Sequence, residues 1–167
     1  MEKLTKPNIR FESQHDDEET IMALRSHPIT QVFWVINAFI ILLILFFVNM
    51  LLPMIFNVNQ IIFINLFGLV FVFFYSWYNF LNWYFNVGII TNQRVIDVDY
   101  YYILYKEITV ADLAKIQDIT VKTGGFLGSL LNYGNIFIQT AGTDPNIEFI
   151  NISKPNRVRE IIDGLTK

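Results

Sequence analysis

The sequence has no cysteine, only two histidines, and few charged residues, which are unevenly placed. The absence of cysteine excludes disulfides, thiol catalysis and cysteine-ligated metal sites, and it fits a reducing compartment. Charged residues make up 16% of the 167 positions, whereas about 25% is usual in soluble domains, and none occurs from position 26 to position 93. With a net charge of −3 the chain offers no broad basic face, so we expect no nucleic-acid partner.

Long apolar runs fill the region without charge. As a helix, the 22 residues from Trp34 to Ile55 would be about 33 Å long, enough to cross a hydrocarbon core of about 30 Å. Buried core helices of a soluble protein are a weaker interpretation, because two such runs follow each other closely. A cleaved signal peptide is also disfavoured, because the first 29 residues are long and acidic. We therefore predict a transmembrane hairpin over residues 30–85, with spans at about 32–56 and 60–84, in the cell membrane.

The residues that flank these runs indicate an orientation. Arg25 and Arg94 lie outside the runs and the connecting loop has neither lysine nor arginine, so the positive-inside bias places both termini in the cytoplasm. Aromatic residues gather towards the same end of the hairpin, as in an interfacial belt. The predicted membrane-interface residues are Trp34, Trp77, Trp83 and Tyr84.

Asparagines are the main polar residues inside the runs. With a turn centred near residues 58–59, Asn37 comes to lie almost opposite Asn79, and we predict a hydrogen-bonded pair between them. The alternative is that each side chain reaches the headgroups. Neither interpretation indicates transport, since the spans contain no ionisable side chain of the kind that marks ion paths.

The segments on either side of the hairpin have different patterns. In the cytoplasmic N-terminal segment, residues 1–29, Asp16 or Asp17 would cap a short helix near 17–26, and we expect that helix to pack on the C-terminal domain. Residues 86–167 are a series of short segments rich in β-branched and aromatic residues, separated by turn signals, which indicates antiparallel strands. In the first turn, Asn92 is suited to a positive φ.

The end of the chain has a helical period. Pro155 is placed where a helix begins, and the apolar residues Val158, Ile161, Ile162 and Leu165 follow at helical spacing. The fold class is therefore an α+β membrane protein, in which a two-helix transmembrane hairpin precedes a small antiparallel β-barrel or sandwich covered by a C-terminal α-helix.

No catalytic, metal or cofactor site emerges from the sequence. The run Gly124-Gly125-Phe-Leu-Gly128 lacks the strand and long helix of a dinucleotide fingerprint, so a glycine turn into a short helix is the better interpretation. Asp97 and Asp99 share a strand face that we expect to be solvated, opposite an apolar face with Ile96 and Val98. The residues Tyr100, Tyr101, Tyr102 and Tyr105 form a candidate binding surface, although strand faces more often divide tyrosines between core and rim.

The basic residues near the early strands allow one ligand hypothesis. If Arg94, Lys115 and Lys122 converged near the membrane, they would contact lipid phosphates or a partner. Acidic residues are interspersed with them, so a solvated face of mixed charge is the favoured interpretation.

Several segments, in their order along the chain, resemble bacterial membrane proteins with a pleckstrin-homology-like (PH-like) domain. They are ETIMALRSHPIT, the apolar hairpin, GIITNQRVIDVD, LAKIQDITVK, LLNYGNIFIQTAG and INISKPNRVREII. The resemblance implies a seven-stranded PH-like barrel in the cytoplasm, closed by the C-terminal helix. It also implies that a core strand begins at Ile116-Gln117-Asp118 and that Leu130 to Gly134 shapes the following turn. It brings no catalytic residues.

The function expected from these features is that of a non-enzymatic interaction or scaffold module at the membrane. Its expected partners are membrane lipids and either a protein partner or further copies of the chain. The first alternative is a module that binds lipid headgroups. Less favoured are an accessory subunit of a membrane transport complex and a membrane enzyme with an unrecognised site.

Overall fold

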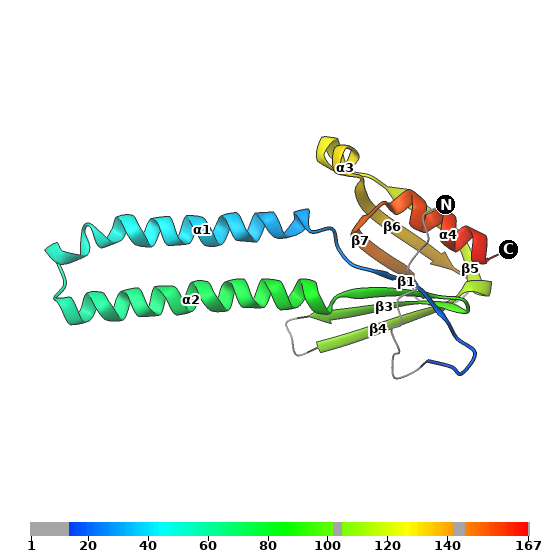
Figure 1. Ribbon diagram of the computed structural model, residues 1–167, viewed down its shortest axis with the longest axis horizontal. Coiled ribbons are helices and arrows are strands. Elements are labelled where there is room, and N and C mark those ends of the chain that lie inside the picture. Colours follow the sequence, from blue (N-terminus) through cyan, green and yellow to red (C-terminus); the bar gives the residue numbers. More distant parts are fainter. Residues whose placement is uncertain (1–13, 102–104, 142–145, 167) are drawn as a thin grey trace. The chain divides into compact units, whose positions relative to one another are not determined.

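A computed structural model describes residues 14–101, 105–141 and 146–166 (Figure 1). The chain divides into two compact units. Pro28–Trp83 forms the helical hairpin, and Met1–His27 together with Tyr84–Lys167 forms the β domain. The β domain is therefore discontinuous in sequence, since the whole hairpin is inserted between its first two strands.

The helical hairpin consists of α1 (Ile29–Asn49), a short 3-10 turn (Leu52–Met54) and α2 (Val58–Phe85). Both helices are long and apolar enough to cross a membrane, with mean hydropathies of 2.8 and 2.0 over their most apolar windows, of which 11% and 6% are buried. Most of their apolar side chains are exposed, whereas a core helix of a soluble protein buries them. The helices approach closely at Gly68, where a Cβ atom would lie 3.0 Å from Leu45 Cδ2.

The asparagine pair that forms in the hairpin is not the predicted one. The side-chain amides of Asn49 and Asn65 donate to each other at 2.7 Å. Asn79 donates to the carbonyl of Tyr75 in its own helix, and Asn37 is exposed. The prediction was wrong because the midpoint between Asn49 and Asn65 is position 57, so the turn is centred earlier than expected.

Two antiparallel sheets form the β domain. Sheet A has the strand order β1-β2-β3-β4, and sheet B has the order β5-β6-β7. The strands of sheet A are β1 (Thr20–Leu24), β2 (Val87–Thr91), β3 (Arg94–Tyr101) and β4 (Tyr105–Asp112). Those of sheet B are β5 (Ile116–Lys122), β6 (Tyr133–Thr140) and β7 (Ile147–Ser153). A 3-10 turn (Leu113–Lys115) links the sheets, α3 (Gly125–Leu131) joins β5 to β6, and α4 (Pro155–Leu165) follows β7.

The helix predicted near residues 17–26 is instead strand β1. It pairs antiparallel with β2, with Leu24 opposite Gly88 and Met22 opposite Ile90. The segment does pack on the domain, as expected, but through backbone hydrogen bonds, and the domain therefore begins before the hairpin and not at residue 86. The prediction relied on an acidic helix cap. It missed that the edge of β2 has unpaired backbone N–H and C=O groups, which can form hydrogen bonds with an extended segment.

The core lies between the sheets and is closed by α4. Ile90, Val95, Ile136, Ile138 and Ile162 have at most traces of exposed surface. The sequence predictions for this region are confirmed: α4 begins at Pro155 and buries Val158 and Ile162, β5 begins at Ile116, and the glycine run leads into a short helix. The seven strands implied by the resemblance are all present among the described residues, although the first precedes the hairpin.

Candidate functional site

Both connections to the helical hairpin leave the β domain from neighbouring strands. β1 ends at Leu24, β2 begins after Asn86, and Leu24 is paired with Gly88. We call the side of the β domain where these strand ends lie the connection end. Strand register places further strand ends on this side, namely Tyr101 and Tyr105, Lys122, Tyr133 and Ser153. The opposite side, with the β2–β3 turn and the 3-10 turn before β5, is the distal end. The chain between β1 and the hairpin also touches sheet B, since the His27 N–H donates to the Asn151 carbonyl at 2.7 Å.

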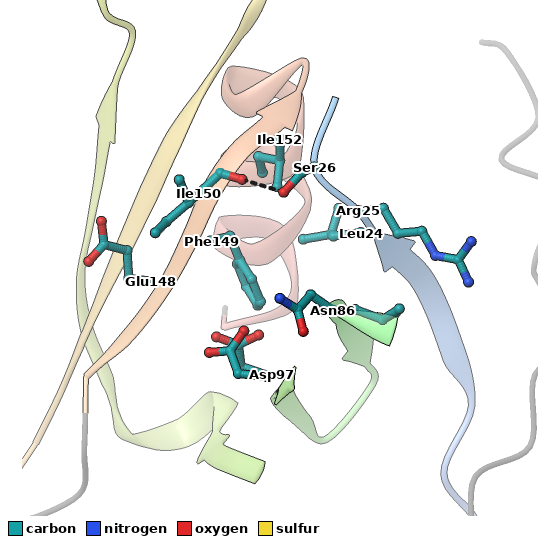
Figure 2. A pocket seen from close by; sticks show the side chains of 12 residues that line it. Leu24, Arg25, Ser26, Asn86, Asp97, Glu148, Phe149, Ile150 and Ile152 are labelled. Atoms are coloured by element: carbon teal, nitrogen blue, oxygen red, sulfur yellow. Dashed lines mark hydrogen bonds between the residues drawn. The ribbon is translucent and has the colours of Figure 1, made fainter. Parts of the chain in front are cut away.

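A cavity of about 200 Å³ opens in the β domain between β1, β2, β3 and β7, near the connection end. Figure 2 shows the Asp97 carboxylate and the Asn86 amide directed into it beside the ring of Phe149, while Arg25 and Glu148 point away. Leu24 and Ile152 complete an apolar wall, and Asp99 contributes a second carboxylate to the lining. Ser26 donates to the Ile150 carbonyl at 3.0 Å and thereby ties the chain after β1 to β7 at the rim. We call this space the Asp97 cavity.

Asp97 lies on the core side of β3, which reverses the expected arrangement. It shares a strand face with Val95, a fully buried member of the core, and it is itself only 9% exposed. Burial, as the largest cause, and the nearby carboxylates of Asp99 and Glu107 together raise the pKa of Asp97 from 3.8 to about 7, although a hydrogen bond from the Val98 N–H acts to lower it. The expectation of a solvated acidic face was wrong because both faces of β3 carry apolar residues, Val95 on one and Ile96 and Val98 on the other, so the alternation alone does not tell which face is inner.

Gly88 allows the Phe149 ring to pack against β2 in the lining of the Asp97 cavity. It is paired with Asp97 across β2 and β3, and a Cβ atom there would lie 2.3 Å from Cε1 of Phe149. The absence of a side chain lets the ring cross from sheet B and pack on the backbone of sheet A. The signal in the sequence was a lone glycine inside a strand pattern, which often marks such a close approach.

We expect Asp97→Asn to stabilise the β domain at neutral and higher pH. Folded Asp97 keeps its proton between its ordinary pKa of 3.8 and about 7, whereas the unfolded chain releases it. The free energy of unfolding of the wild type therefore falls as pH rises through this window, by up to about 1.4 kcal/mol per pH unit. Asparagine removes this loss. The free energy of unfolding of the variant should therefore exceed that of the wild type by on the order of a few kcal/mol at about pH 8, and by little at about pH 4.

Urea unfolding of the full chain in detergent, followed by far-UV circular dichroism across this pH range, measures the difference. Asp118→Asn is the matched control, because that carboxylate is exposed on β5. If the free energy of unfolding depends on pH in the same way in the wild type and in Asp97→Asn, the burial of an ionisable Asp97 is contradicted.

The three basic residues proposed as ligand contacts do not come together. Arg94 lies at the distal end, where it donates through Nε and Nη2 to the two carboxylate oxygens of Glu18, both at 2.9 Å. Lys115 is also distal and lies 3.2 Å from the carboxylate of Asp112. Lys122 is at the connection end, with Nζ 4.4 Å from the centre of the Phe137 ring. As a convergent set they therefore form no phosphate site.

The Glu18–Arg94 pair fastens the N-terminal segment to the β2–β3 turn. Burial would raise the pKa of Glu18, but hydrogen bonds from Arg94, the His15 N–H and Thr91 outweigh it and hold the pKa at about 2. The same pairing raises the pKa of Arg94. Sequence reasoning missed Glu18 because its partner is 76 positions away.

The β2–β3 turn is built by side-chain hydrogen bonds. Thr91 Oγ1 accepts from the N–H groups of Gln93 and Arg94. Asn92 Oδ1 accepts from the Glu19 N–H at 2.9 Å. The positive φ predicted for Asn92 was wrong, since the residues other than glycine with positive φ in the described parts are Asn132, Asn151 and Lys154. The role of Asn92 is to hold the N-terminal segment.

The predicted interface aromatics are placed on the two helices. Trp34 Nε1 donates to Gln31 near the start of α1, and Trp77 stacks on Phe73 at 6.2 Å. Trp83 lies 6.3 Å from Phe80 in the same helix. Tyr84 belongs to the β domain, where the Arg25 guanidinium lies 4.7 Å from its ring centre. Their contact with a membrane interface stays a prediction.

The tyrosine cluster is described only in part. Tyr100 lies 5.3 Å from the Phe85 ring, and Tyr105 is 64% exposed at the connection end. Tyr102 lies outside the described residues. Within residues 14–101, 105–141 and 146–166, no three histidine or acidic side chains are grouped closely enough to hold a metal ion.

Comparison with known proteins agrees with the resemblance. The model of the family described as Bacterial PH domain matches residues 32–166. A crystal structure of a DUF1696 family protein with a pleckstrin-homology domain, from Shewanella loihica PV-4, is similar at a TM-score of 0.40 and 13% sequence identity, covering 49% of this chain and 71% of that one. No curated protein matches. Since the family model spans most of the chain, from within α1 to the residue after α4, the chain belongs to the bacterial PH domain family.

Proposed function

We propose that this bacterial PH domain protein is a membrane-anchored interaction module without catalytic activity. In this proposal α1 and α2 span the cell membrane with both termini in the cytoplasm, and the β domain presents the Asp97 cavity to a protein partner. The observation that carries the proposal is the cavity itself, which combines an apolar wall around Phe149 with the carboxylates of Asp97 and Asp99.

The chemistry of the cavity favours a basic side chain over a phosphate. The Asp97 carboxylate is directed into it and Asp99 adds a second carboxylate to the lining, whereas Arg25 and Glu148 both point away. Carboxylates repel a phosphate group but pair with an ammonium or guanidinium group. Lysine and arginine also have apolar stems that suit a wall of phenylalanine, leucine and isoleucine. A lysine or arginine of a protein partner is therefore the group that we assign to the cavity.

The placement of the basic residues also argues against a headgroup pocket built on Arg94, Lys115 and Lys122. Arg94 and Lys115 are at the distal end, and each has an acidic partner. Lys122 is at the other end of β5, the length of a strand from Lys115. A phosphate would have to break the buried Glu18–Arg94 pair to reach Arg94, which opposes this form of the lipid-headgroup alternative.

Site-specific photocrosslinking in intact cells tests the proposal. A benzoylphenylalanine at Ile150, which lines the cavity and is 53% exposed, should capture a protein. The same group at Ala114, exposed at the distal end, is the positional control. Replacing Asp97 and Asp99 together with asparagine should abolish the product at position 150, because the basic side chain loses its counter-charges.

Each outcome of the crosslinking has a defined meaning. A cytoplasmic or membrane protein captured at position 150, and lost in the double asparagine variant, supports the proposal. A product that contains a second copy of the chain identifies the partner as a homo-oligomer. Capture of a protein from the opposite side of the membrane would reverse the orientation, and capture of lipid alone would refute the protein-partner function.

A further inference from the structure

The short helix α3 presents an apolar face that the β domain does not use. Phe126, Leu127, Leu130 and Leu131 are 79%, 50%, 65% and 37% exposed. At about 100° per residue these positions fall on one side of the helix, because residues three and four apart lie above one another. The other side packs on the domain through Gly128, where a Cβ atom would lie 3.2 Å from the Tyr133 carbonyl oxygen. The glycine contact therefore turns the four large side chains outwards.

The position of α3 within the β domain is at the connection end. Asn132 ends α3 and β6 begins at Tyr133. The Tyr133 ring is stacked on that of His27, with centroids 5.5 Å apart. The residue after α3 therefore packs against His27, from which the chain continues towards α1.

Lysines adjoin both ends of α3. No aspartate or glutamate occurs from position 119 to position 143, whereas Lys122 comes just before α3. The Lys154 N–H donates to the Asn132 carbonyl at the end of α3, at 2.8 Å. Lys154 also lines a cavity of about 350 Å³ between β1 and α4, together with Arg25, Arg157 and no acidic residue. Asp99 and Glu107, the acidic residues nearest to the β3–β4 end, are on sheet A.

We propose that α3 inserts its apolar face into the cytoplasmic leaflet of the anionic bilayer that the hairpin spans, with Lys122, Lys154 and Arg157 next to the headgroups. An apolar helix face with flanking cations has the composition of an interfacial anchor, which buries its side chains about 5–10 Å into the headgroup and acyl boundary. A protein partner is the competing occupant, but the basic residues that adjoin α3 and the absence of aspartate and glutamate from positions 119 to 143 favour an anionic lipid surface. This inference rests on the proposed membrane crossing.

The cysteine-free chain allows a direct test by single-cysteine labelling. Phe126→Cys and Leu130→Cys, each labelled with an environment-sensitive nitrobenzoxadiazole dye, report on the apolar face. Ser129→Cys, beside the apolar face of the same helix, is the matched control, and Ala114→Cys at the distal end is the aqueous reference. Ile44→Cys, exposed near the middle of α1, reports on the hairpin. The full chain is reconstituted in vesicles of phosphatidylethanolamine and phosphatidylglycerol, with or without doxyl-labelled lipid.

Insertion predicts a blue-shifted emission at positions 126 and 130, quenched by doxyl groups near the headgroup end of the acyl chain. Quenching of the dye at position 129 should be weaker, and the emission of the dye at position 114 should not be quenched. Position 44 should be quenched best by doxyl groups near the chain terminus. In phosphatidylcholine vesicles the quenching at 126 and 130 should decrease, and unchanged quenching there would overturn the role of the cations.

The outcomes separate this inference from the proposed function. If the dye at position 44 is quenched while the dyes at positions 126 and 130 behave like the dye at position 114, the hairpin spans the membrane and α3 does not insert. If 126 and 130 are blue-shifted but not quenched, a protein contact covers the face and the inference is overturned. If 44 is not quenched by lipid, the membrane crossing fails and the inference fails with it.

Discussion

Replacing Arg94 with methionine is expected to lower the free energy of unfolding of the β domain by about 3–5 kcal/mol near neutral pH. The Glu18 side chain is completely buried and Arg94 is 13% exposed, with a bidentate contact between them. Removal of the guanidinium leaves a buried carboxylate without its main partner, and that costs more than the pair contributes when it is intact. Urea unfolding of the full chain in detergent measures the loss.

The pH dependence distinguishes this cause from a general packing defect. In the wild type the pKa of Glu18 is about 2 when folded and 4.5 when unfolded, so its contribution is present above pH 4.5 and is lost as pH falls towards 2. Without Arg94, burial dominates and raises the pKa, so Arg94→Met should instead become less destabilised on acidification. The double variant Glu18→Gln with Arg94→Met should recover most of the stability. An equal loss at every pH, without recovery in the double variant, would contradict this account.

Substitution of Gly88 by alanine is the second change with a large expected effect. The new Cβ would lie 2.3 Å from Cε1 and 2.8 Å from Cδ1 of Phe149, a ring that is buried in the core. Either the ring or the β1–β2–β3 pairing must shift, so we expect a loss of about 1–3 kcal/mol or more in the free energy of unfolding. The Asp97 cavity should be distorted at the same time, because Gly88 and Phe149 both line it.

A double-mutant cycle tests whether the ring is the cause. Leucine at position 149 lacks the Cε1 and Cζ atoms, so Gly88→Ala should cost much less in a Phe149→Leu background than in the wild type. Gly164→Ala is the matched control, since nothing lies within 4 Å of a Cβ built there, and it should be neutral or slightly stabilising. Additive effects of the two changes at 88 and 149 would exclude a steric origin.

Local patterns in the sequence predicted the elements that depend on local physics. The hairpin, α4 from Pro155, the glycine turn before α3 and most strands of the β domain follow from residue periods and turn chemistry, whereas the number of strands was implied by the family resemblance. The predictions that failed concern pairings across long stretches of chain. β1 was assigned as a helix because its partner strand lies beyond the hairpin, and the asparagine pairing was wrong because a small error in the turn centre moves every partner.

The candidate site was predicted less well than the fold. Arg94 was identified, but as a ligand contact, since its partner Glu18 is far away in sequence. Asp97 was assigned to solvent because strand alternation does not fix the inner face when both faces carry apolar residues. A further signal was available: Gly88 interrupts a strand pattern, and such a residue often marks an approach by another part of the chain.

The insertion of the hairpin between β1 and β2 sets an order of events during synthesis. At about 5–20 residues per second, β1 leaves the ribosome several seconds before β2 exists, so its backbone has no strand to pair with in that time. Closing so long an intervening loop as random coil would be entropically costly, but an antiparallel helical hairpin returns the chain to its starting point. Folding of the two helices therefore brings the ends of the inserted segment together and lowers the entropic cost of pairing Leu24 with Gly88.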